Sequence, residues 1–309
     1  AEFLTQFYYI AWIGACILAI ILVLIQRMSW IIAKLEGAAD EYYMVSFIPA
    51  LLIWGYMGDE NVLLSFIVAC LVALIACWGY MKVKDQKKYH LVYLLLMTPS
   101  LYWLFGPVVL IFLCFAVINI MIDAKSKLTG MGCSLCVVVY TLGWILFVST
   151  FMQYPMFRIF GGINYYRFPA VIPDMQIVVM AVFLIIPFIV RLLPHQEKRV
   201  VQRACISIVI IAICGFAGVR LGYDTLKYEL IDYDYLVRYE QWDKIIEKAE
   251  KDQPSTPMGV ASVNLALAEK GVLGDRMFEF FQNGAEGLLP PFVRDFTTPL
   301  CTSEAFYRL

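Results

Sequence analysis

Two adjacent carboxylates, Asp59 and Glu60, lie between apolar runs in the stretch WGYMGDENVLLSF, and the flanking residues 44–58 and 61–81 carry no charge. A carboxylate at the mouth of a helix bundle can bind a metal ion or accept a proton from a hydroxyl group. The same side chains can also cap the helix that follows, where the helix dipole favours an acid by about 0.3–1 kcal/mol. The sequence alone leaves both interpretations open.

A second candidate site lies in the stretch MQYPMFRIFGGINYYRFPAVIPDM, which contains Arg158, Arg167, Tyr165 and Tyr166. Arginine is well suited to bidentate contacts with phosphate, and aromatic rings stack on sugars. These four residues are therefore candidates for substrate binding. The alternative is an aromatic belt at the membrane interface with two arginines that reach toward the headgroups.

The cysteines and histidines give weaker signals. Cys133 and Cys136, in CSLC, have the spacing of redox or metal-ligand pairs, but no second CxxC motif or histidine pair accompanies them. Cysteine also replaces small apolar residues within helices, which is the simpler interpretation. His90 and His195 lie near basic clusters, and neither has a second ligand at the spacing of a zinc motif. No metal can be assigned from these residues.

The amino-acid composition indicates the environment that surrounds most of the chain. Hydrophobic residues make up 61% of the 309 positions, and charged residues make up 16%. The mean hydropathy is +0.74, whereas a soluble domain is only about 45–50% apolar. We therefore expect a membrane protein in contact with the lipid bilayer. The net charge of −1 gives no basis for binding nucleic acid.

The pattern of apolar runs predicts an all-α fold, a polytopic bundle of about eight transmembrane helices at residues 1–221. A span needs about 20 predominantly apolar residues, fewer where neighbouring helices help. We expect the spans at residues 7–26, 44–57, 62–81, 90–105, 107–123, 133–152, 175–193 and 201–220.

Basic residues alternate from one predicted connection to the next. They gather in the links at 27–34, 82–88, 125–127 and 191–203, whereas Asp59, Glu60 and the turn Gly106-Pro107 stand in links without Lys or Arg. The positive-inside rule places the first group in the cytoplasm and the second outside. The chain starts at Ala1 without a basic leader and ends in a helical pattern. We therefore expect further chain at both ends, including a helix or signal before Ala1.

Residues 222–309 differ in composition, with dense charge and apolar residues at helical spacing. VRYEQWDKIIEKAE and VNLALAEKGVLGDRMFEFF have the same layout, a helix followed by a turn and a second helix. The arrangement resembles tetratricopeptide repeats, with Trp242 to Ala249 and Pro254 matching the second helix and its closing proline. We expect an outward-facing repeat domain. Its core should contain five mostly buried side chains, those of Trp242, Ile245, Leu265, Leu267 and Phe278.

The stretch GDENVLLSFIVACLVALIA resembles the second outer loop and following helix of GT-C glycosyltransferases, which use polyprenyl-phosphate-linked sugars. The resemblance implies catalysis by Asp59 and Glu60 at the outer face. It also implies a further acid in the first outer loop, which here corresponds to Glu2 if one helix precedes Ala1. The resemblance does not identify a cofactor, and a divalent cation is one candidate. A bound polyprenyl-phosphate lipid is the partner that the resemblance implies.

A likeness over whole segments is more specific. FLTQFYY, EQWDKIIEKAEKDQP and GLLPPFVRDFTTPLCTSEAFYRL resemble an uncharacterised family of bacterial multi-pass inner-membrane proteins with a repeat tail. This implies a periplasmic C-terminal domain and supplies no activity. Two functions follow as hypotheses: a GT-C-like glycosyltransferase, or a noncatalytic membrane scaffold whose repeat tail binds an envelope protein.

Overall fold

The structure is a computed structural model. It describes residues 2–6, 10–58, 62–152, 159, 174–193, 200–254, 256–288, 290 and 307. These described residues form helices and connecting turns, with no β-strand among them. The chain divides into two compact units, residues 1–220 and 221–309. The all-helical fold predicted from the sequence is confirmed for the described part of the chain.

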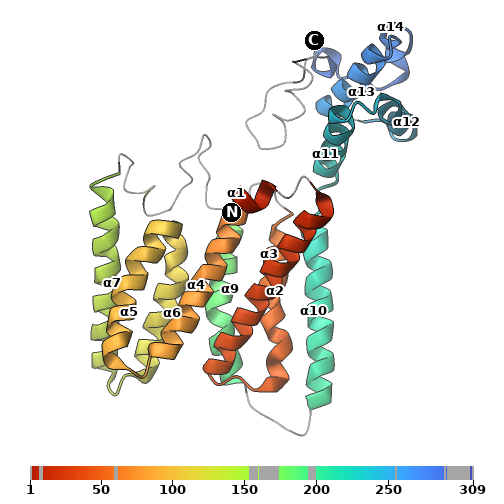
Figure 1. The fold of residues 1–309 in the computed structure, drawn as a ribbon. Coiled ribbons are helices and arrows are strands. Elements are labelled where there is room, and N and C mark those ends of the chain that lie inside the picture. The colour runs from red at the N-terminus through yellow and green to blue at the C-terminus, as the bar shows by residue number, and fades with distance from the viewer. Residues whose placement is uncertain are drawn as a thin grey trace. The chain divides into compact units, whose positions relative to one another are not determined.

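The first unit is a bundle in which successive long helices run in opposite directions (Figure 1). A four-residue helix, α1 (Glu2–Thr5), comes first and packs against α2 and α4. The other helical elements are α2 (Ala11–Leu35), η2 (Asp40–Phe47), α3 (Ile48–Tyr56), α4 (Leu64–Val83), α5 (Lys87–Phe105), η3 (Gly106–Val108), α6 (Val109–Asp123), α7 (Lys127–Ser149), α9 (Asp174–Leu192) and α10 (Val200–Gly222).

Helix α2 is longer than its predicted span. We expected a connection at 27–34, but the helix continues through these residues and carries their basic side chains. The helix ends where Gly37 adopts a φ of 99°. The Gly37 amide donates to the Lys34 carbonyl at 3.0 Å, and the Ala38 amide donates to the Ala33 carbonyl at 2.9 Å. This pattern is a Schellman motif, which requires a residue such as glycine in the left-handed region.

Four stretches among the described residues are long and apolar enough to cross a membrane, or up to five if a bent helix pair counts as one span. They are Trp12–Leu35, Leu64–Val83, Lys88–Asp123 and Lys127–Ser149. The third stretch contains both α5 and α6, which meet at Gly106, where φ is 59°. The rings of Tyr93 and Phe112 lie 6.2 Å apart, so the two helices fold back on each other.

Helix α4 lies in the core of the bundle. Its residues Cys70, Ala73, Ala76 and Cys77 are buried. Small residues on one helix let neighbouring helices approach closely, which is how helices pack in a membrane without a hydrophobic driving force between them. Cys70 and Cys77 therefore serve as small packing residues in the core.

The second unit contains α11 (Thr225–Arg238), α12 (Trp242–Lys251), α13 (Pro257–Glu269), α14 (Leu273–Arg276), η5 (Met277–Glu279) and η6 (Gly284–Gly287). Asp224 caps α11 by accepting from the Leu226 amide at 3.1 Å, and Thr256 caps α13 by accepting from the Gly259 amide at 3.2 Å. Both are preferred N-cap residues. Helices α11, α12 and α13 pack on one another around a common core.

The predicted core of this unit is partly correct. Ile245 and Leu267 are fully buried, and Trp242 and Leu265 are partly buried against the same cluster. The prediction for Phe278 was wrong, because its side chain is 86% exposed. Phe278 lies in the short turn η5 after the four-residue α14. The long second helix that would have carried its ring into the core does not form there, and Phe280 is buried instead.

Candidate functional site

Most residues of the predicted outer site lie outside the described residues. Asp59, Glu60, Arg158, Arg167, Tyr165 and Tyr166 are all in this group, and Glu2 is the first residue of α1. Cys133 and Cys136 are exposed on α7, and neither forms a disulfide.

The start of α4 bears on the capping interpretation of the acidic pair. Leu63 occupies the N-cap position of this helix, with an extended backbone and no side-chain cap. Asp59 and Glu60 lie four and three positions earlier in the sequence, so neither occupies the N-cap position itself. Both carboxylates lie outside the described residues, so an interaction of either with the N-terminus of α4 stays a prediction.

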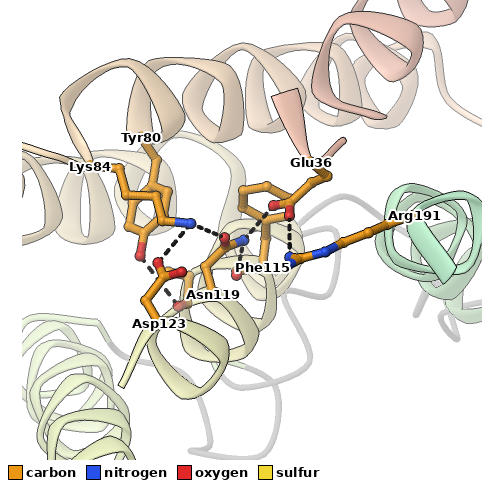
Figure 2. A network of polar contacts seen from close by, with 8 residues as sticks. Glu36, Tyr80, Lys84, Phe115, Asn119, Asp123 and Arg191 are labelled. Carbon is orange, nitrogen blue, oxygen red and sulfur yellow. Dashed lines mark hydrogen bonds and ion pairs between the residues drawn. The ribbon is translucent and has the colours of Figure 1, made fainter. Parts of the chain in front are cut away.

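The described part of the bundle contains a different polar site, which the sequence analysis missed. Five side chains form a continuous chain of contacts, shown in Figure 2. In order along the chain of contacts they are Arg191, Glu36, Asn119, Lys84 and Asp123. We call this set the charge network.

The buried half of the charge network centres on Glu36. Its Oε2 accepts from Arg191 Nη1 at 3.1 Å, and its Oε1 accepts from Asn119 Nδ2 at 2.8 Å. The same Asn119 amide donates to the Phe115 carbonyl at 3.2 Å. Both carboxylate oxygens of Glu36 therefore have partners, as a buried anion requires.

The other half of the charge network centres on Lys84. Its Nζ donates to Asn119 Oδ1 at 2.8 Å and lies 2.6 Å from Asp123 Oδ2. The Asn119 amide thus joins the two ion pairs, donating to the carboxylate of one and accepting from the ammonium of the other. The result is two carboxylates and two cations in one balanced chain.

Local structure explains why these side chains meet. Glu36 is the C-cap residue of α2 and Lys84 is the C-cap residue of α4, while Asp123 ends α6 and Arg191 lies in the last turn of α9. Helices α2, α4, α6 and α9 run in the same direction, so their C-terminal ends gather at one end of the bundle (Figure 1). We call this the network end.

Burial differs along the charge network. The Glu36 side chain is 1% exposed and Asn119 is fully buried. The outer members are open to solvent, with side-chain exposures of 39% for Arg191 and 47% for Asp123. Tyr80 is buried beside Asn119, and its hydroxyl donates to the Ala116 carbonyl at 3.5 Å. The ring of Tyr80 also packs edge-on against Phe115.

The network is best suited to joining helices. Each charge has an opposite charge or a hydrogen-bond partner within the set. Removing one member of a buried pair leaves an uncompensated charge, which is strongly destabilising. Among the described residues, no group of three or more His, Cys, Asp or Glu side chains is arranged to hold a metal ion.

Three sequence signals point to this site in retrospect. Glu36 and Asp123 are acids at helix C-termini, where the helix dipole disfavours negative charge. Asn119 is an amide inside the apolar run VLIFLCFAVINIMID. An acid at the wrong end of a helix, or a buried amide in a span, needs a partner from another helix.

These features define an all-helical protein with helices long and apolar enough for a membrane and a buried charge network at one end. The chain belongs to a family of unknown function, DUF6057, whose model matches residues 1–309. No curated protein and no solved structure matches the chain.

Proposed function

We propose that the protein is a GT-C-like membrane glycosyltransferase that uses a polyprenyl-phosphate-linked sugar. Its site would lie at the end of the bundle opposite the network end. The supporting observation is that described neighbours of the predicted site residues pack on one core. Leu4, Met57, Val62 and Ile159 all belong to or contact the same hydrophobic cluster.

Ile159 carries this argument for the Arg158 loop. It is 2% exposed, and its carbonyl accepts a hydrogen bond from the Tyr102 hydroxyl at 3.4 Å. Tyr102 lies in the last turn of α5, at the end where α2 and α4 begin and where α1 lies (Figure 1). This supports the proposal that Glu2, Asp59 and Arg158 share one end of the bundle.

The chemistry proposed for this end divides between the two residue types. A carboxylate of Asp59 or Glu60 would accept the proton of the acceptor hydroxyl as that oxygen bonds to the sugar. Arg158 or Arg167 would bind the phosphate that leaves with the polyprenyl chain, because guanidinium contacts phosphate in a bidentate manner. A divalent cation held by the carboxylates would serve the same purpose.

Mass analysis of lipid-linked sugars and glycoproteins tests this proposal, in cells with and without the protein. Asp59→Asn should abolish the difference between the two, because an amide neither accepts the proton nor binds a cation as strongly. Asp40→Asn is the matched control, since Asp40 lies at the network end with its side chain 85% exposed. Unchanged products with Asp59→Asn would exclude this carboxylate as the catalytic base.

A noncatalytic scaffold is the second candidate, supported by the compact second unit with its own core. In this function a tetratricopeptide-like tail binds an envelope protein, and the bundle is its anchor. Deleting residues 222–309 would then have the same effect on cells as loss of the whole protein, whereas Asp59→Asn would have no effect. The opposite pattern favours the transferase.

We also propose eight spans in a bacterial inner membrane, with the network end in the cytoplasm and the second unit in the periplasm. The basic connections support this orientation, because Lys82, Lys84, Lys125 and Lys127 lie at the network end. Single-cysteine labelling at positions 87 and 248 tests it. If an impermeant reagent labels position 248 only after the inner membrane is breached, the proposed orientation is wrong.

A further inference from the structure

Helix α11 carries a row of large exposed side chains opposite its buried face. Tyr228, Ile231, Tyr235 and Tyr239 recur at intervals of three or four residues, so they share one face of the helix. Their exposures lie between 45% and 53%. We call this row the tyrosine stripe.

The opposite face of α11 belongs to the core of the second unit. Tyr233, Leu236 and Val237 are buried there against α12 and α13. The tyrosine stripe therefore lies on the other face of α11 and is not part of this core. Its rings associate with one another, since Tyr235 and Tyr239 have centroids 4.6 Å apart.

The stripe reaches back to the end of the preceding apolar helix. Tyr223 stacks on Tyr228 with a centroid distance of 4.6 Å and an interplanar angle of 26°. Tyr223 directly follows Gly222, the last residue of α10. Asp224 then caps α11, so only two residues separate the helices. The three Cα–Cα steps from Gly222 to Thr225 span at most about 11 Å.

Helix α10 is apolar on most of its surface, as expected of a helix surrounded by lipid. Exposed apolar side chains occupy several of its faces, including those of Ile206, Val209, Ile210, Ile213, Phe216 and Val219. If α10 crosses the bilayer, the short connection keeps the first turn of α11 close to the bilayer surface.

We propose that the tyrosine stripe lies in the interfacial region of the lipid bilayer, with the rings among the headgroups and upper acyl chains. Tyrosine is enriched at this depth because its ring is apolar and its hydroxyl is polar. Ion pairs border the stripe at Asp232–Lys248 and at Asp234–Arg238. Paired charges are compatible with the polar headgroup layer and disfavour deep insertion. The inference does not depend on the proposed transferase activity.

Spin labelling of the full chain in phosphatidylethanolamine–phosphatidylglycerol vesicles tests the proposal. The nine cysteines are first replaced, and single cysteines at Ile231 and Tyr235 are labelled with a nitroxide. Lys244 is the matched control, because it is also exposed and lies on α12. Collision rates with oxygen, which partitions into lipid, and with a water-soluble nickel chelate are then measured at each position.

We expect the ratio of oxygen to nickel collision rates to be several-fold higher at positions 231 and 235 than at 244. Equal, water-like ratios at all three positions would overturn the proposal. Low collision rates with both reagents at 231 and 235 would also overturn it, because they would mean that protein covers the stripe. A label at Tyr228 repeats the measurement if the label at 235 disturbs folding, which is checked by the thermal unfolding midpoint.

Discussion

The carboxylate of Glu36 and the side-chain amide of Asn119 lie 2.8 Å apart although 83 positions separate them in the sequence. This hydrogen bond joins the end of α2 to the last turns of α6. On its other side the same amide accepts from Lys84, so one fully buried residue connects two ion pairs. The geometry of the network end therefore depends on Asn119.

Asn119→Leu should destabilise the bundle, because leucine has a similar size but cannot bind either Glu36 or Lys84. A buried polar group left without a partner costs about 1–3 kcal/mol. The thermal unfolding midpoint of the purified protein in detergent measures the effect. Thr141→Val is the matched control, since within the described part of the chain the Thr141 hydroxyl bonds to a carbonyl of its own helix, that of Val137. An equal effect of the two substitutions would contradict the role given to Asn119.

Arg191→Gln should destabilise the protein more than Glu36→Gln. The first change leaves a buried carboxylate without its cation, whereas the second leaves an arginine that is 39% exposed and can turn toward water. Loss of one partner from a buried pair costs about 3–5 kcal/mol, and the partial exposure of Arg191 favours the lower limit.

The double variant Glu36→Gln with Arg191→Gln provides the control for this prediction. Its loss of stability should be smaller than the sum of the two single losses, because no charge is then left unpaired. Additive losses, measured by the same unfolding experiment, would mean that the two side chains do not interact in the folded protein.

The long helices were predictable because the apolar runs are strong signals. The predicted segment 62–81 corresponds to α4 at Leu64–Val83, and 201–220 corresponds to α10 at Val200–Gly222. Local chemistry determined the errors at the ends. Composition marked 27–34 as a basic connection, but the chain stays helical until Gly37 allows a positive φ.

The charge network was not predicted because its members come from four separate helices. Periodicity identifies which face of a helix is apolar, but it gives no partner for Glu36 or Asn119 on another helix. Phe278 shows the converse error. The apolar spacing around it is helical, yet α14 has only four residues and leaves the ring exposed. Tertiary packing, which the local pattern does not contain, decides both outcomes.

The second unit should tolerate substitutions according to the observed burial. Ile245→Ala should cost about 2–5 kcal/mol, since it removes buried methyl groups from the contact between α11, α12 and α13. Phe278→Ala should change stability by less than about 0.5 kcal/mol, because surface positions away from special features tolerate substitution. Amide hydrogen exchange over residues 222–288 of the full chain measures both. Loss of protection with Phe278→Ala would place that ring in the core after all.

Helices α3 and α10 approach each other at Gly55 and Gly218. A Cβ atom built on Gly55 would lie 2.8 Å from the Gly218 Cα, whereas one built on Gly218 would lie 3.4 Å from the Gly55 Cα. The first contact is with backbone that cannot rotate away, so Gly55→Ala should separate the helices and lower the thermal unfolding midpoint. Gly218→Ala should have a smaller effect.

Gly215→Ala is the matched control for this pair, because nothing lies within 4 Å of a Cβ at that position. Alanine favours a helix over glycine by about 1 kcal/mol, so this variant should be neutral or slightly more stable. The expected order of unfolding midpoints is Gly215→Ala highest, then Gly218→Ala, then Gly55→Ala. A midpoint for Gly55→Ala equal to that of Gly215→Ala would show that α10 does not pack on α3 at this crossing.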